Sequence, residues 1–77
     1  MTLTIADLQK GEKGIILDTS SNDIPLKLLE MGCLPGNSVE LVLVAPFSDP
    51  IYLNINGTHL AIRKDTANHI LIDTNNE

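Results

Sequence analysis

The dipeptide Asn56-Gly57, which separates two segments of alternating polarity, restricts the fold of this chain most strongly. Asn-Gly favours a two-residue type I′ turn, because both central residues of that turn need a positive φ. Such a turn fixes the strand register and places Ile51 opposite Ile62. A shift by one residue would bury polar side chains, so the sequence predicts a hairpin with a single register. Its apolar face comprises Ile51, Leu53, Ile55, Leu60 and Ile62.

Three further strands are predicted around this hairpin. Residues 14–17 form a short apolar run with β-branched side chains, which is typical of a buried strand. Residues 38–45 alternate with apolar side chains on both faces, with Leu43 and Val39 pointing the same way. Residues 69–72 read as a closing strand, and a short helical turn with an inward-facing alanine precedes them.

One main helix is predicted between the first two of these strands. Proline is tolerated in the first turn of a helix, and Pro25 stands directly before a run of good helix formers. Gly32 follows this run and supplies the left-handed residue that a helix C-cap needs. If Gly32 is that cap, Cys33 is the next residue and can pack back on Leu28.

Length and composition complete the prediction of the fold. The chain has 77 residues, which suits a single domain, predicted for residues 1–73 with a polar tail at 74–77. With only one Tyr and one Phe, the core must be aliphatic, and its β-branched residues favour strands. We therefore expect a mostly β protein, a strongly bent sheet or partly closed barrel of about five strands with one main helix after the first strand.

Charge and motif content exclude several classes of function. A net charge of −5 disfavours binding to the phosphates of nucleic acids and to anionic lipid. No signal peptide or long apolar stretch is recognisable, so we expect a cytoplasmic protein without membrane insertion. The single cysteine leaves no disulfide framework and no Cys-rich zinc site. Phosphate-loop, zinc-protease and nucleophile-elbow motifs are absent, so we expect no catalytic residue and no cofactor.

A few residues are candidates for a metal site, a nucleophile, a phosphate contact or a structural cap. Cys33, His59 and His69 are the only soft metal ligands, and nothing local brings them together, so no metal site is predicted. Cys33 is not expected to act as a nucleophile, because a helix C-terminus raises the pKa of a thiol. Arg63 could contact a phosphate, but the sequence favours a structural residue at a strand end. Asp49 is predicted to accept hydrogen bonds from nearby backbone N–H groups.

The helix suggests a surface for a partner. Leu26 and Leu29 are spaced to face the sheet, which places Leu28 and Met31 on a second stripe. An exposed surface of aliphatic side chains and methionine is typical of partner sites. The alternative is a helix with both stripes covered. The predicted partner-binding residues are Lys27, Leu28, Met31, Cys33 and Leu34.

The same region resembles the FeoA family. The similarity begins with Leu26-x-x-Leu29-x-Met31-Gly32-x-Leu34-Pro35-Gly36 and continues with Ala45-Pro46-x-x-Asp49-Pro50-Ile51 and Leu60-Ala61-Ile62-Arg63. This resemblance extends from Leu3 to Ile72. It implies an SH3-like β-barrel and a small cytoplasmic accessory protein of bacterial ferrous iron uptake. The implied partner is FeoB, a membrane transporter with a cytosolic GTP-binding domain.

The resemblance leads to three hypotheses, none of which makes the protein an enzyme in its own right. In the first, the helix surface docks on FeoB and modulates its activity or assembly, and Leu28→Asp or Met31→Asp abolishes docking without unfolding the domain. In the second, Arg63 acts in trans as a GTPase activator for the FeoB G domain. In the third, His59 and His69 help to carry ferrous iron. Exposed strand edges also leave a homo-oligomer open.

Overall fold

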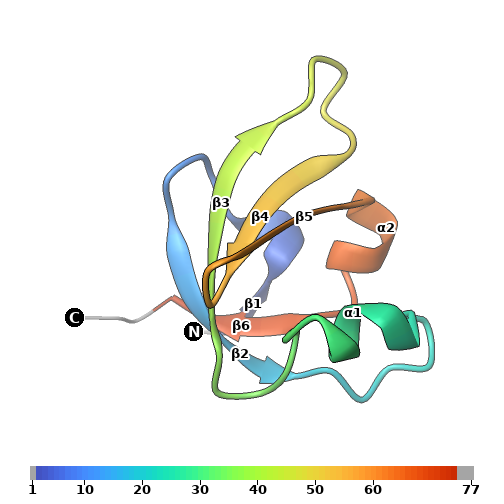
Figure 1. Ribbon diagram of the computed structural model, residues 1–77. Helices are drawn as coiled ribbons and strands as arrows, with labels where there is room; N and C mark the ends of the chain where they lie inside the picture. The colour runs from blue at the N-terminus through green and yellow to red at the C-terminus, as the bar shows by residue number, and fades with distance from the viewer. Residues whose placement is uncertain (1, 75–77) are drawn as a thin grey trace.

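Six short antiparallel strands and three helical segments of about one turn are found in residues 2–74, the part of the chain that the computed structural model describes (Figure 1). Their order is β1 (Thr2–Thr4), the 3₁₀ helix η1 (Ile5–Asp7), β2 (Lys13–Asp18), α1 (Leu26–Glu30), β3 (Ser38–Val44), β4 (Ile51–Ile55), β5 (Thr58–Ile62), α2 (Lys64–Ala67) and β6 (Leu71–Asp73). The mostly β class is confirmed. The predicted polar tail lies outside the described residues except for Thr74.

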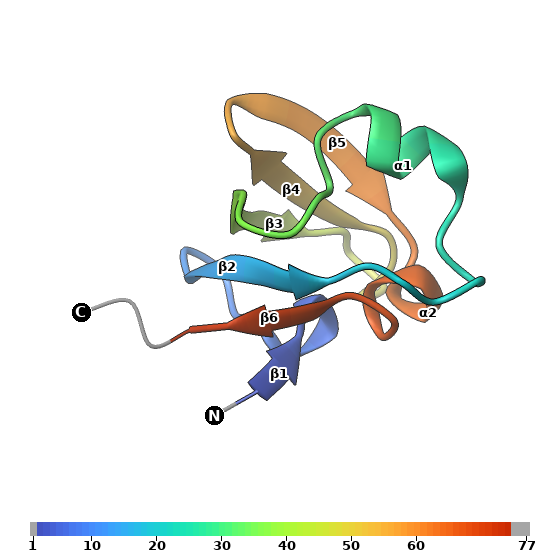
Figure 2. The same ribbon diagram turned by 90° about the horizontal axis from the view of Figure 1, so that it is seen from below.

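The strands form one sheet in the order β1-β6-β2-β3-β4-β5. The sheet is strongly curved, as the two views of the ribbon show (Figures 1 and 2). Because β1 and β5 do not pair with each other, the sheet has two edges and the predicted barrel is not closed. Strand β1 was not expected, so α1 follows the second strand rather than the first. None of the helices in residues 2–74 is long and apolar enough to span a membrane.

The hairpin of β4 and β5 forms in the predicted register. Asn56 and Gly57 have φ angles of 51° and 92°, as a type I′ turn requires. Ile51 lies opposite Ile62, and the other pairs follow in step to the turn. The side-chain oxygen of Asn54 accepts a hydrogen bond of 2.8 Å from the Gly57 N–H and so stabilises the turn.

Helix α1 ends at the predicted glycine cap. Gly32 has a φ of 104°, a conformation that a residue with a Cβ adopts only with strain. Two backbone bonds of 3.1 Å close the end of the helix, from the Gly32 N–H to the Leu29 carbonyl and from the Cys33 N–H to the Leu28 carbonyl. This pattern is a Schellman motif, in which the residue after the glycine packs against the one five positions before it. Leu28 and Cys33 are accordingly both in the core.

The core is aliphatic, as the composition predicts, and its buried members come from both halves of the sheet and from the helical segments. They are Ile5, Leu8, Ile16, Ile24, Leu28, Cys33, Val39, Leu41, Ile51, Leu53, Ile55, Ile62, Ala67, Ile70 and Ile72.

Two strands are less covered than the sequence predicts. In β2 only alternate residues are buried, so the prediction of a fully buried strand was wrong for Ile15 and Leu17. In β3 the register with β4 shifts between Leu41 and Leu43, which is the mark of a β-bulge. The bulge turns Leu43 to the outer face beside Tyr52, whereas simple alternation had placed it inward.

Candidate functional site

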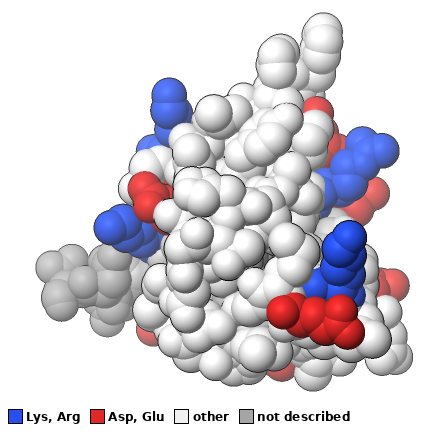
Figure 3. Space-filling model, viewed as in Figure 1, with Lys and Arg blue, Asp and Glu red and all other residues white. Residues whose placement is uncertain are grey.

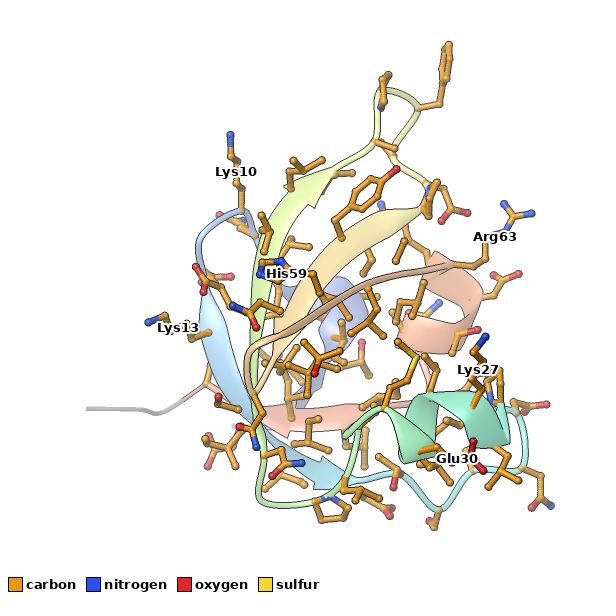
Figure 4. All side chains as sticks on the ribbon, viewed as in Figure 1. Lys10, Lys13, Lys27, Glu30, His59 and Arg63 are labelled. Atoms are coloured by element: carbon orange, nitrogen blue, oxygen red, sulfur yellow. The ribbon has the colours of Figure 1, made fainter. Side chains whose placement is uncertain are left out.

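An open groove with a volume of about 490 Å³ separates α1 from β5. One wall is α1 with the residue before it, the other is β5, and the start of α2 closes one end. Figure 4 shows Lys27 and Arg63 on the same side of the molecule, with His59 nearer the other end of β5. The groove is lined by Pro25, Lys27, Leu28, Met31, His59, Leu60, Ala61, Ile62, Arg63 and Thr66.

Helix α1 presents a different face to the sheet than the sequence predicts. Leu28 points into the core and is 9% exposed, whereas Leu26 is 68% exposed. Leu29 packs at the margin of the core. The expectation that Leu26 faces the sheet while Leu28 stays accessible was therefore wrong.

The predicted partner-binding residues consequently separate into three groups. Leu28 and Cys33 are buried, so neither can present an open docking surface, although Leu28 forms part of the groove floor. Lys27 and Met31 line the groove. Leu34 is exposed but lies outside the groove. Whether a partner binds these residues stays a prediction.

The charge of the groove is opposite to that of the whole chain. Its lining includes the basic residues Lys27 and Arg63 but no Asp or Glu, whereas the chain carries a net charge of −5. Figure 3 shows this face of the molecule with an uncharged centre and with both basic and acidic side chains at its margin, of which the acidic ones lie outside the groove lining. The groove is therefore an apolar hollow with a basic rim.

Arg63 occupies the structural position that the sequence favours. Its guanidinium lies 3.7 Å from the Asp49 carboxylate and is 75% exposed, so this pair contributes little to stability. The other oxygen of Asp49 accepts a hydrogen bond of 3.0 Å from the Lys64 N–H. Asp49 thus caps the first residue of α2 from a distant loop, where the sequence predicted a cap on a nearby backbone N–H.

This cap predicts a measurable loss of stability in Asp49→Ala. Removing a carboxylate that caps a helix costs about 1 kcal/mol, which lowers the Tm of a domain of this size by roughly 4–8 °C. Thermal unfolding followed by circular dichroism measures the change. Asp23→Ala is the matched control, because the Asp23 carboxylate lies 3.7 Å from His69 Nε2 at an exposed site. Equal shifts in the two variants would contradict the capping role of Asp49.

The three soft metal ligands lie in different environments. His59 lines the groove and His69 lies beside Asp23 in a separate hollow. Cys33 is buried, and this burial raises the pKa of its thiol, which keeps the thiol protonated. Within residues 2–74, no three His, Cys, Asp or Glu side chains gather so that they could hold a metal ion.

Comparison with known proteins identifies the family. The family model described as the FeoA domain matches residues 3–74. The chain belongs to the FeoA family. A FeoA-like protein of Clostridium acetobutylicum has the same fold, with a TM-score of 0.86 and 25% identity over 99% of this chain and 90% of that one. A zinc complex of FeoA from Stenotrophomonas maltophilia, described as a procaryotic SH3 domain protein, has a TM-score of 0.77 and 21% identity over 92% and 89%.

One curated relative of this FeoA chain links the family to ferrous iron transport. It is the Fe(2+) transport protein A/Fe(2+) transporter FeoB fusion protein of Porphyromonas gingivalis, which is 26% identical over 72 residues. The match covers 92% of this chain and 8% of the fusion protein, so the chain corresponds to a small part of that relative.

The wall of the groove that β5 provides was not predicted as a site. His59 was considered as a metal ligand and Arg63 as a phosphate contact, but otherwise residues 59–63 appeared in the sequence only as the second half of a hairpin and as part of the family resemblance. That β5 stands at the edge of the sheet, beside α1, follows from the strand order and not from any local motif. His59 and the single arginine at the end of the strand, Arg63, were the local signals.

Proposed function

We propose that this FeoA protein is an accessory subunit of ferrous iron uptake that binds the cytosolic part of a FeoB transporter and modulates its activity or assembly. The observation that supports this proposal most directly is the fusion of a related segment with FeoB in one polypeptide of P. gingivalis. A fused domain meets its neighbour at a high effective concentration, whereas a separate chain must reach it by binding.

The groove between α1 and β5 is the surface that we propose for this binding. It is concave, its floor includes Leu28 and Met31, and its rim carries Lys27 and Arg63. Methionine and arginine are enriched in protein interfaces, while acidic side chains are depleted there. The groove thus contains a methionine and an arginine, and no Asp or Glu lines it.

Regulation through this groove requires differential binding. A bound module changes the nucleotide state or the gating of a transporter only if it binds one conformation more tightly than another. The ratio of the two affinities sets the size of the effect, and typical couplings are about 1–3 kcal/mol. The affinity for FeoB must therefore depend on the nucleotide that FeoB holds.

Calorimetric titration of the protein into the cytosolic GTP-binding region of FeoB from the same organism tests this proposal. We expect binding, with Kd values that differ at least about fivefold between the apo, GDP and GTP-analogue states. Equal affinity in all three states would exclude regulation by differential binding, and a role in the assembly of FeoB would then remain as the function. Absence of binding in every state would contradict the proposal.

The exposed position of Arg63 supports one alternative. The 3.7 Å separation from Asp49 leaves its guanidinium available to a partner at the rim of the groove. Arg63 could then act in trans as a GTPase activator, which would raise hydrolysis by about 10³ or more. The rate of GTP hydrolysis in the same mixture distinguishes this role from binding alone. An iron carrier has less support, because His59 and His69 line different hollows.

A further inference from the structure

The outer edge of β5 carries backbone groups without partners. β5 stands at one end of the sheet and pairs only with β4. The pair Ile55 and Thr58 closes a two-residue turn, so it is hydrogen-bonded, and such pairs alternate along the hairpin with non-bonded ones. Counting from Thr58, the N–H and C=O groups of His59 and Ala61 therefore point away from β4. Within residues 2–74, these groups have no hydrogen-bond partner.

This edge faces the groove. Successive side chains of a strand point to opposite faces of its sheet, so a surface that touches only one face includes every second residue. The groove is instead lined by five consecutive residues, His59 to Arg63. A wall of consecutive residues is the edge of a strand, and the free groups of His59 and Ala61 thus line the groove.

The opposite wall supplies apolar contacts and charge. Helix α1 contributes Leu28, and Met31 follows directly after the helix; both line the groove together with β5. Lys27 has no ion-pair partner within the described residues. Together with Arg63, whose guanidinium stays 75% exposed beside Asp49, it gives the groove two basic residues and no carboxylate in its lining, on a chain whose net charge is −5. Charge complementarity therefore favours an acidic occupant.

We infer that the groove binds an extended acidic segment with aliphatic side chains, which pairs with β5 as an additional strand. This inference rests on the proposed function for the identity of the partner, FeoB, and specifies the chemistry of the segment that binds. Main-chain hydrogen bonds to His59 and Ala61 would provide affinity, and alternate side chains would enter the apolar groove. The basic rim would select acidic segments.

A second copy of this chain fits the groove less well. Pairing of β5 with β5 would bring two copies of Lys27 and Arg63 together, and like charges at an interface are unfavourable. Strand addition by an acidic segment removes the free edge and neutralises the rim at the same time. The occupant is therefore expected to be a segment of a different chain.

Hydrogen exchange measured by NMR tests this inference with two probes. One is the cytosolic region of FeoB, and the other is a peptide of alternating Glu and Val, about six residues long, the usual length of a strand. We expect both to slow exchange of the His59 and Ala61 amides. The Leu60 amide, which already bonds to β4, should change little. A peptide of alternating Lys and Val should bind at least about tenfold more weakly.

Ala61→Pro provides a second test, because proline removes the outward N–H of Ala61 and spares the bonds to β4. We expect it to weaken binding of both probes about tenfold or more. Ala61→Val keeps the N–H and is the matched control, which should bind nearly as the wild type does. Unfolding of Ala61→Pro would leave the exchange measurement on the wild type as the deciding result.

The outcomes separate this inference from the proposed function. If FeoB binds without new protection at His59 and Ala61, strand addition is overturned while the proposed function stands. If the Glu-Val peptide protects both amides but FeoB does not bind, the proposed function fails and the specificity of the groove stands. Protection of His59 that rises with protein concentration alone would indicate a second copy as the occupant and overturn the inference.

Discussion

Replacing Leu28 with aspartate is expected to leave too little stability for the protein to remain folded. Leu28 is 9% exposed and belongs to the aliphatic core. Truncation of a buried leucine alone costs about 2–5 kcal/mol, and an unpaired carboxylate in an apolar site adds a further penalty. A domain of 77 residues has a total free energy of unfolding of only about 4–11 kcal/mol. The sequence-based expectation, in which this variant stays folded and only loses docking, is therefore replaced.

Far-UV circular dichroism during urea denaturation measures this loss, and Leu26→Asp is its matched control. Leu26 lies two positions earlier on the same helix and is 68% exposed. An aspartate in the first turn of a helix is favourable to the helix dipole, so the free energy of unfolding should change by less than about 0.5 kcal/mol. A cooperative transition for Leu28→Asp near that of the wild type would show that Leu28 is not held in the core.

The hairpin was predictable because its determinants are local. The turn Asn56-Gly57 demands positive φ at both positions, and the observed angles satisfy that demand. Once the turn is fixed, the alternation of apolar residues fixes the face, and both signals indicate the same register. Two independent local constraints that agree are sufficient for a correct prediction.

The face of α1 was not predictable from spacing, because the helix has only five residues. Apolar residues at positions 26, 28, 29 and 31 surround such a short helix, so no stripe is unique. The C-terminal end of the helix instead determines which residues of α1 are buried. In a Schellman motif, the residue after the glycine packs against the residue five positions earlier, which here joins Cys33 to Leu28. The sequence predicted the glycine cap and the contact of Cys33 with Leu28, yet Leu28 was still assigned to an accessible stripe of the helix.

The groove depends on the order of strands, which the sequence did not reveal. Strand β1 has three residues and pairs with β6 at the far end of the chain. Without β1, a partly closed barrel with little free edge was a reasonable expectation. The observed sheet instead leaves β5 as an edge beside α1. The bulge in β3, which turns Leu43 outward, likewise depends on pairing with β4. No glycine or proline in β3 indicates its position in the sequence.

Met31→Asp is the substitution expected to weaken binding to the cytosolic region of FeoB most strongly while the domain stays folded. Met31 is partly buried and lines the groove at the end of α1. Loss of a central apolar contact at an interface costs about 2 kcal/mol, which corresponds to roughly a thirtyfold increase in Kd. A carboxylate would also repel an acidic segment. At a helix C-terminus it destabilises the fold by only about 0.3–1 kcal/mol. Calorimetric titration gives the Kd, and thermal unfolding verifies the fold.

Leu34→Asp separates the groove from its surroundings. Leu34 is 44% exposed and follows Met31 by three residues, but it lies outside the groove. The substitution introduces the same charge into the same segment, so long-range electrostatic effects should be similar in the two variants. If the groove is the binding surface, Leu34→Asp should bind nearly as the wild type does. If Leu34→Asp weakens binding and Met31→Asp does not, the loop after α1 is the docking surface, and strand addition at β5 loses its basis, because the contact would then lie away from the β5 edge.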